Sequence, residues 1–225
     1  MPWASLIPVI CVFTVIGICF LVRSRNNRRS PGTEKLLRSP GHSVSIKLDE
    51  IQDNLSTLLI FLIFSPPFAL ALHSGKPIPN WGFIILAIGY GIVFYYFLKL
   101  LTKSSNYRLG LMGERAVGEE LNQLMLDGFR VFHDFPADGK WNIDHVLVGS
   151  QGVYIVETKA RRKQQGPAGH QDHVVIYNGQ TLKFPHCEDQ YGLQQASRNA
   201  RWLGNFLSSA TGEPVTVRPI LTFPG

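Results

Sequence analysis

Three long apolar blocks constrain the fold of this 225-residue chain more than any other feature of its sequence. They cover residues 3–22, 55–72 and 81–101, and each is almost free of charged side chains. A helix needs about 20 apolar residues to cross the hydrocarbon core of a bilayer, and all three blocks are near that length. The sequence therefore predicts about three transmembrane α-helices, one in residues 1–22 and two in residues 55–101.

Two other interpretations of these blocks fit less well. Buried helices of a soluble core seldom run this long with so few charges. A cleaved secretory signal would carry basic residues before its apolar stretch, whereas the basic residues here follow the 3–22 block. The 55–72 block is the weakest of the three because it is short and contains Pro66 and Pro67, which a spanning helix tolerates.

The basic residues predict how the chain is oriented. The segment 23–54 is polar and holds much of the excess behind the net charge of +6. Lys99 lies at the end of the third block and Lys103 and Arg108 follow it, whereas only Lys76 lies between the second and third blocks. Because cytosolic loops are enriched in Lys and Arg, we expect 23–54 to be a basic cytosolic loop. The chain would then be a multi-pass protein of the cell (inner or cytoplasmic) membrane, with its N-terminus outside, its C-terminal domain in the cytosol and the lipid bilayer as a partner.

Residues 110–225 have the composition of a compact α/β domain, long enough to bury a core of its own. Apolar residues at helical spacing predict two helices, and β-branched apolar runs bounded by turn residues predict strands. Turn residues at 149–152 and at 178–179 predict two hairpins. The expected helices are 112–126 and 188–207, and the expected strands are 129–135, 142–148, 153–159, 174–177, 181–184 and 214–223.

The first hairpin groups two acids and a lysine. A loop at Ser150 and Gln151 places Asp144 directly opposite Glu157, where Cβ atoms are about 4.5–5.5 Å apart. Lys159 shares a face with Glu157 because side chains alternate along a strand. The hairpin is largely apolar, so two facing carboxylates would repel each other and be costly to desolvate. A divalent cation between them removes both problems, and the lysine can then hold the attacking water or the scissile phosphate. A cross-strand salt bridge on an exposed sheet face explains the same three residues equally well.

The helix predicted upstream offers a third acid. Glu114 falls within the apolar arc that contains Val117 and Leu121, at about 100° per residue. A carboxylate on a packed face needs a partner, and the cation site is a candidate. Glu119 and Glu120 fall outside that arc and are expected to be solvated.

The last predicted helix carries a polar ridge beside its apolar stripe. Such a ridge either contacts the phosphates and bases of a nucleic acid or is simply a solvated face. Its members are Gln190, Gln194, Arg198 and Arg201. His145 follows Asp144 directly but should point to the opposite face of the sheet, and the histidines have no spacing typical of a metal site.

Three motifs occur in a fixed order along the domain, and a helix Glu, a strand Asp and an E-x-K strand are more specific together than any one of them. The motifs are Gly110-Leu111-Met112-Gly113-Glu114, Asn142-Ile143-Asp144-His145-Val146 and Gly152-Val153-Tyr154-Ile155-Val156-Glu157-Thr158-Lys159. In this set the chain resembles the nuclease-related domain (NERD) family, which belongs to the wider PD-(D/E)XK nuclease group. The resemblance runs from about Gly110 to the end. One departure from the wider group is Ile143, which stands where a proline precedes the aspartate.

The resemblance implies both a fold and a set of roles. The fold is an α/β, restriction-endonuclease-like core with a central mixed sheet flanked by helices. Asp144 and Glu157 would bind Mg²⁺ (or Mn²⁺), Lys159 would assist the nucleophile, and Glu114 would be the helix acid. Gln190 would match a glutamine on the following helix of related nucleases.

Two functions follow from this reading. The first is a membrane-anchored nuclease that hydrolyses phosphodiester bonds, with DNA as the expected partner and Mg²⁺ as the cofactor. The second is a catalytically inactive scaffold that holds nucleic acid or protein at the membrane. A small channel or transporter is less well supported, because no ionisable residue lies near the centre of any apolar block.

Overall fold

The structure, a computed structural model, describes residues 37–73, 79–139, 141–162, 174–185 and 187–224, together with Thr14 and Gly17. The first predicted membrane span, in residues 1–22, lies outside this part of the chain apart from those two residues. Contacts divide the chain into two compact units. The helical unit contains Met1–Leu36 and Asp49–Ser104, and the α/β unit contains Leu37–Leu48 and Ser105–Gly225.

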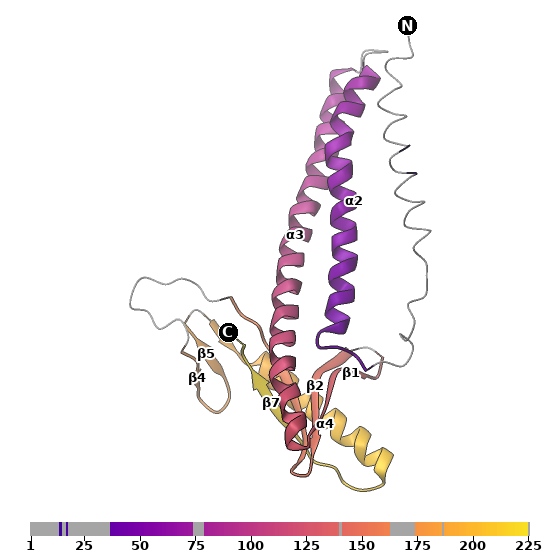
Figure 1. Cartoon of the computed structure of the whole chain (residues 1–225). Helices are drawn as coiled ribbons and strands as arrows, with labels where there is room; N and C mark the ends of the chain where they lie inside the picture. The colour runs from indigo at the N-terminus through magenta and orange to yellow at the C-terminus, as the bar shows by residue number, and fades with distance from the viewer. Residues whose placement is uncertain are drawn as a thin grey trace. The chain divides into compact units, whose positions relative to one another are not determined.

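Two long helices make up the described part of the helical unit (Figure 1). They are α2 (His42–His73) and α3 (Asn80–Gln123), and the Tyr90 hydroxyl on α3 donates a 3.3 Å hydrogen bond to the Leu62 carbonyl on α2. Both helices are long and apolar enough to cross a membrane, a property that core helices of soluble proteins can share. Here, however, the apolar side chains are exposed: only 6% of the most apolar stretch of α2, and 0% of that of α3, is buried.

Both helices run further than the sequence predicts. The expected loop 23–54 is helical from His42 onward. The expected helix 81–101 and the expected helix 112–126, as far as Gln123, are parts of one helix, α3. The physical reason is that a change from apolar to charged residues does not end a helix, whereas a left-handed glycine does. Even Pro66 and Pro67 lie inside α2. Pro40 and Gly41, with φ of 70° at the glycine, precede α2. Gly128, with φ of 87°, closes the short 3₁₀ turn η1 (Leu124–Asp127) that follows α3.

A four-stranded mixed sheet forms the centre of the α/β unit. Its strands are β1 (Arg130–Ala137), β2 (Trp141–Gly149), β3 (Gly152–Thr158) and β7 (Val217–Thr222), in the order β1-β2-β3-β7. The first three strands are antiparallel neighbours, and β7 is parallel to β3. The helix α4 (Tyr191–Thr211) packs on β3 and β7 (Figure 1). The expectation of an α/β domain with a mixed sheet flanked by helices is confirmed.

The two predicted hairpins are present. In the first, His145 lies opposite Val156 and Val148 opposite Val153, which is the register that the turn residues predict. The second is the antiparallel pair β4 (Ile176–Tyr177) and β5 (Leu182–Phe184). A third short strand, β6 (Cys187–Asp189), completes a small sheet where the sequence predicted the start of a helix. The helix α4 therefore begins later, at Tyr191.

The main sheet is covered on both faces, and this burial is what makes the hairpin a rigid base for a site. On one face, Ala196, Ala200 and Leu203 of α4 pack against Ile143, Val146 and Ile155. On the other face, Val117, Leu121 and Leu124 pack against Val131, Leu147 and Val156. Burial of such apolar side chains contributes about 1.5–3 kcal/mol each to folding, so the strands that carry the charged residues are held firmly.

Candidate active site

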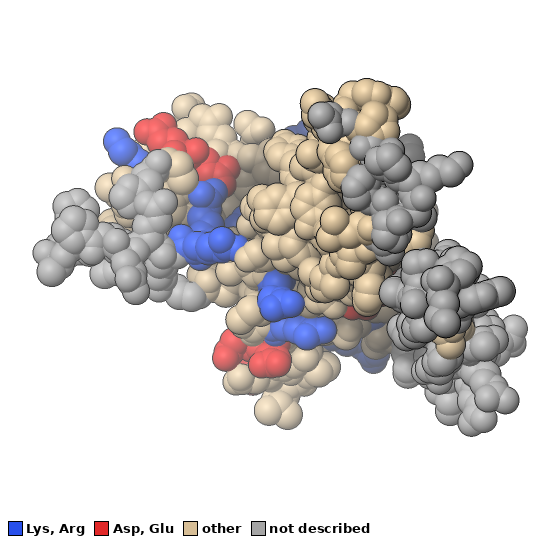
Figure 2. Space-filling view, turned by 90° about the horizontal axis from the view of Figure 1, so that it is seen from above, with Lys and Arg blue, Asp and Glu red and all other residues tan. Residues whose placement is uncertain are grey.

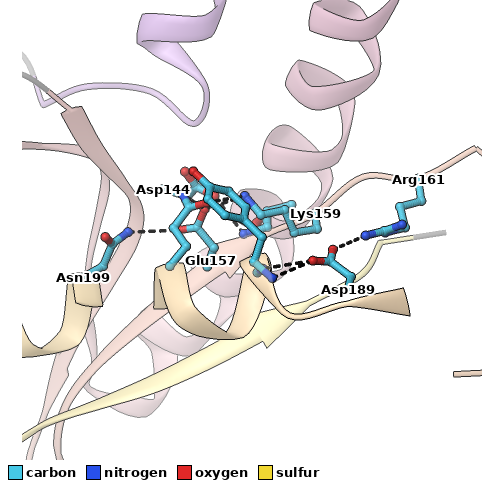
Figure 3. Close-up of polar contacts among 10 residues, drawn as sticks. Asp144, Glu157, Lys159, Arg161, Asp189 and Asn199 are labelled. Atoms are coloured by element: carbon cyan, nitrogen blue, oxygen red, sulfur yellow. Dashed lines mark hydrogen bonds and ion pairs between the residues drawn. The ribbon is translucent and has the colours of Figure 1, made fainter. Parts of the chain in front are cut away.

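Glu157 lies at the centre of the polar cluster that the sequence predicted on β3. Its side chain is only 1% exposed, and both of its oxygens accept hydrogen bonds. Lys159 Nζ donates to Oε1 at 2.9 Å, Asn199 Nδ2 donates to Oε2 at 3.0 Å, and Gln195 Nε2 also donates to Oε1. Figure 3 shows Asn199 and Lys159 approaching the carboxylate from opposite sides. A buried carboxylate costs little only when its oxygens are satisfied in this way.

Lys159 is held from two sides. Its ammonium donates to Glu157 Oε1 and to Gln195 Oε1, each at 2.9 Å. Because the Gln195 amide also donates to Glu157, the three side chains form a closed triangle of hydrogen bonds. The ammonium remains about a quarter exposed, at 25%, so a ligand in solvent can still reach it.

Asp144, on the neighbouring strand β2, meets the cluster from the side (Figure 3). Its Oδ2 accepts a 2.8 Å hydrogen bond from the Thr158 amide. Burial raises the pKa of Asp144 well above its usual value, and the charges of Glu157 and Glu114 raise that pKa further; the Thr158 hydrogen bond and Lys159 oppose the rise. The two strand acids predicted to face each other therefore do interact electrostatically.

Glu114 reaches the same cluster from α3. Burial, Asp134 and Glu157 together raise its pKa to about 7, against the opposing effect of Lys159. Gly41 lies directly against Glu114: a Cβ there would stand 3.6 Å from Glu114 Oε2 and only 2.5 Å from the Leu111 side chain. Glycine is required at position 41 both by this close approach and by its left-handed φ of 70°.

The cluster carries more negative than positive charge. Burial also raises the pKa of Glu157, although Lys159, Asn199 and Arg198 act to lower it. Two buried carboxyl groups, those of Glu114 and Glu157, and the half-buried one of Asp144 thus share one ammonium, and the pKa values of all three are raised. Such a group of acids takes up either protons or a cation.

A fourth acid, Asp134 on β1, is one that sequence reasoning missed. It is 2% exposed and has a positive φ of 47°. Arg38 Nη1 donates to it at 3.0 Å, and Asn142 Nδ2 at 3.1 Å. The Ser43 hydroxyl donates at 2.5 Å, and the Ser43 amide at 3.2 Å. No pattern near Asp134 in the sequence signals this role, because two of its partners come from the separate segment Leu37–Leu48.

The glutamine that reaches the site is Gln195, not Gln190. Gln190 is the exposed N-cap of α4 and makes no side-chain cap hydrogen bond, and its predicted role stays a prediction. Gln194 and Arg198 are exposed as well, and the guanidinium of Arg198 lies 6.0 Å from the centre of the Trp141 ring. The predicted polar ridge is thus rotated by one helical position, roughly 100°, from Gln195 and Asn199, the two residues of α4 that contact Glu157. The sequence does contain a pattern that indicates the inward polar residues: Gln195 and Asn199 are four residues apart, and each directly precedes a buried alanine, Ala196 or Ala200.

His133 and His145 lie on the other face of the sheet, as the alternation of side chains predicts. His133 and His145 face each other with 2.8 Å between their Nδ1 atoms, and His133 Nε2 lies 3.0 Å from Asn122 Oδ1. Burial, together with His133, lowers the pKa of His145 to about 3, so this ring is neutral. The pair contributes to packing rather than to the acid cluster.

The side chains of the cluster can supply only a few ligands to a small, hard cation such as Mg²⁺. Within the described residues, no group of three or more His, Cys, Asp or Glu side chains is arranged to hold a metal ion. Burial is nevertheless the first cause that raises the pKa values of Asp144 and Glu157, and for Asp144 the charges of Glu157 and Glu114 add to it, so it is costly to ionise both carboxyl groups here. Mg²⁺ commonly takes one or two carboxylates and keeps water or phosphate oxygens as its other ligands, which this pair can supply.

Comparison with known proteins agrees with this arrangement. A family model described as the nuclease-related domain, NERD, matches residues 109–224. The matched segment contains all four residues predicted at the site, Glu114, Asp144, Glu157 and Lys159, and extends over β1 to β7. Searches of curated proteins and of solved structures found no match.

Proposed function

This chain belongs to the nuclease-related domain family, and from that premise we propose that it is a metal-dependent phosphodiesterase that cleaves DNA. We also assign it to the PD-(D/E)XK group, with Asp144 as the strand aspartate and Glu157-Thr158-Lys159 as the E-x-K motif. The observation that carries the proposal is the grouping of three carboxyl groups with raised pKa values, those of Glu114, Asp144 and Glu157, around one partly exposed ammonium. A purely structural ion pair would not need the second and third acids.

The cofactor of this proposal is Mg²⁺ or Mn²⁺, held by Asp144 and Glu157. When bound, such a cation polarises a phosphate oxygen and lowers the pKa of a bound water. Glu157 is already oriented by Asn199 and Gln195, which fix its oxygens on the face shared with Asp144. Asp144 is fixed by the Thr158 amide through Oδ2, which leaves Oδ1 for a cation.

Lys159 and Glu114 would have two further roles, hydrogen-bond donation and proton transfer. The Lys159 ammonium, 2.9 Å from Glu157 Oε1, is placed to donate a hydrogen bond to a phosphate oxygen or to the attacking water. Gln195 keeps it in that position by a second hydrogen bond of 2.9 Å. Glu114, whose pKa is raised to about 7, can hold or release a proton near neutral pH.

Membrane attachment is also part of the proposal. The exposed apolar residues of α2 and α3, which fill the predicted spans 55–72 and 81–101, support contact with lipid; examples are Ile84 and Ile85, each 60% exposed, and Ile88 at 59%. Side chains this apolar are costly to leave in water when they cover a whole helix. The expected orientation places the α/β unit in the cytosol.

A second function, a non-catalytic scaffold for nucleic acid or protein, is favoured by one observation. Both oxygens of Glu157 already accept hydrogen bonds from Lys159, Gln195 and Asn199, so this carboxylate is satisfied without a cation. A scaffold that lost its chemistry would retain such bonds to keep the buried acid stable.

The test is a cleavage assay with the full-length chain in detergent. Single- and double-stranded DNA are incubated with Mg²⁺, Mn²⁺ or EDTA, beside the variants Lys159→Ala and Asp144→Asn. Lys183→Ala serves as the matched control, because Lys183 is an exposed lysine that pairs only loosely, at 3.9 Å, with Glu188. Metal-dependent cleavage that both site variants lose and the control keeps supports the nuclease. No cleavage, with no Mn²⁺ bound to the wild type, rejects it in favour of the scaffold.

A further inference from the structure

An exposed aromatic ring stands beside the proposed catalytic lysine. Tyr191 is the first residue of α4 and is 62% exposed. The Lys159 ammonium lies 5.8 Å from the centre of the Tyr191 ring. Within the part of the chain that the structure describes, the Tyr191 hydroxyl has no hydrogen-bond partner. The exposed ring therefore offers an aromatic surface close enough to the Lys159 ammonium for one nucleotide to contact both.

The backbone of Tyr191 is held in place although its ring is free. Asp189 Oδ1 accepts hydrogen bonds from the amides of Tyr191, at 2.8 Å, and Gly192, at 3.4 Å. Arg161 holds the other carboxylate oxygen of Asp189, and Figure 3 shows this chain of contacts next to the site. A Cβ at Gly192 would meet the Leu221 side chain at 3.1 Å and Lys159 Cγ at 3.6 Å, so the start of α4 lies tight against β7 and the lysine stem. A ring on an anchored backbone loses little entropy when it binds a partner.

Two cations near Tyr191 are paired with acids. Lys159 pairs with Glu157, and Arg161 pairs with Asp189, whose carboxylate also accepts from the Tyr191 amide. Among the described residues, the face seen in Figure 2 carries small groups of Lys and Arg, several of them next to Asp and Glu. Duplex DNA is bound mainly through many phosphate contacts, which such a mixed surface supplies poorly. Aromatic stacking does not depend on an excess of positive charge.

From these observations we propose that the Tyr191 ring stacks on an unpaired base of the substrate, so that the site takes single-stranded or frayed nucleic acid in preference to closed duplex. The proposal rests on the nuclease function and names its substrate class. In a duplex the faces of the bases are covered by their neighbours, whereas an unpaired base can lie on an exposed aromatic ring. The phosphate attached to the stacked base then lies towards Lys159.

The experiment measures binding apart from cleavage. Fluorescence anisotropy follows oligothymidylate, a duplex of the same length, and an oligonucleotide with abasic positions, each with the full-length chain in detergent and EDTA. The abasic strand keeps the phosphates but lacks the bases. Wild type should prefer the single strand to both other ligands. Tyr191→Ala should weaken that binding by about 5- to 100-fold, the range expected for one stacked base, while Tyr191→Phe and Tyr191→Trp retain it.

Tyr177→Ala is the matched control, because Tyr177 is a similarly exposed tyrosine, at 59%, on β4. The proposal is overturned if Tyr191→Ala binds as wild type does, or if abasic strand and duplex bind as tightly as oligothymidylate. The outcome is separable from that of the cleavage assay. Cleavage that is unaffected by Tyr191→Ala rejects the stacking ring and leaves the nuclease standing. Tyr191-dependent binding without any cleavage retains the stacking ring and rejects the nuclease.

Discussion

The Ser43 hydroxyl donates a 2.5 Å hydrogen bond to the Asp134 carboxylate, although 91 positions separate the two residues in the chain. Arg38 and Asn142 add further donors, so that Asp134 joins the segment Leu37–Leu48 to the two strands β1 and β2. This bond shows that residues outside the family match of 109–224 are built into the same compact unit as the site.

Asp134→Asn should destabilise the α/β unit by about 1–3 kcal/mol, because an amide presents only one acceptor to donors that now meet two carboxylate oxygens. Ser43→Ala should cost less, about 1 kcal/mol. Thermal unfolding of the full chain in detergent measures both changes. Asp138→Asn is the control, since Asp138 shares the positive φ (52°) but is exposed, and it should leave the midpoint unchanged. Equal midpoints for all three variants would contradict the role given to Asp134.

Gln195→Ala should lower the rate of DNA cleavage by roughly 10- to 100-fold, the loss expected when a hydrogen bond to a charged group is removed. The physical reason is that Lys159 Nζ loses its second anchor, at 2.9 Å, and Glu157 loses a donor. Single-turnover kinetics at saturating Mg²⁺ is the measurement. Gln194→Ala, one position along the same helix and exposed, should cleave at the wild-type rate. A larger effect at Gln194 than at Gln195 would mean that the helix presents its other face to the substrate.

Stability should depend on pH through Glu114. Its pKa is raised from 4.5 to about 7, so between these values the folded state binds more protons than the unfolded state. The free energy of unfolding must then fall as pH rises from about 4.5 to 7, by on the order of 3 kcal/mol. Glu114→Gln should flatten this slope in metal-free urea titrations at several pH values. Glu119→Gln, exposed on the same helix, should keep it.

Metal binding should strengthen with pH. The pKa values of Asp144 and Glu157 are both raised, so a cation must displace protons from them at acidic pH. Isothermal titration with Mn²⁺ should therefore show a higher affinity at pH 8 than at pH 6, with proton release. Asp144→Asn and Glu157→Gln should each abolish the signal. An affinity that does not change with pH, or that survives in both variants, would place the metal elsewhere.

The sequence predicted the hairpin of the site well because its information is local. A two-residue turn sets the register of the strands, and alternation then places Glu157 and Lys159 on one face. The order of the other strands and of α4 followed from similar local signals, whereas β6 was predicted as the start of a helix. The fold class could therefore be predicted without long-range contacts.

The rest depended on contacts that local patterns do not encode. Gln195 could be identified only once the start of α4 was known, because a shift of one residue rotates a helix by about 100°. Asp134 depends on Arg38 and Ser43, which lie more than 90 positions away in the chain. The single long helix α3 was divided into two predictions because its composition changes sharply along its length.

The α/β unit is discontinuous in sequence: it takes Leu37–Leu48 from one side of the helical segment and Ser105–Gly225 from the other. The segment 49–104 is thus an insertion within the domain and not a leader that precedes it. Gly41, which covers Glu114, and Ser43, which holds Asp134, belong to the first stretch, so a fragment that starts after the helices lacks one wall of its own site. The insertion is joined to the α/β unit at two places, after Leu48 and before Ser105. We expect substitutions within the insertion to disturb the site less than changes at these two junctions.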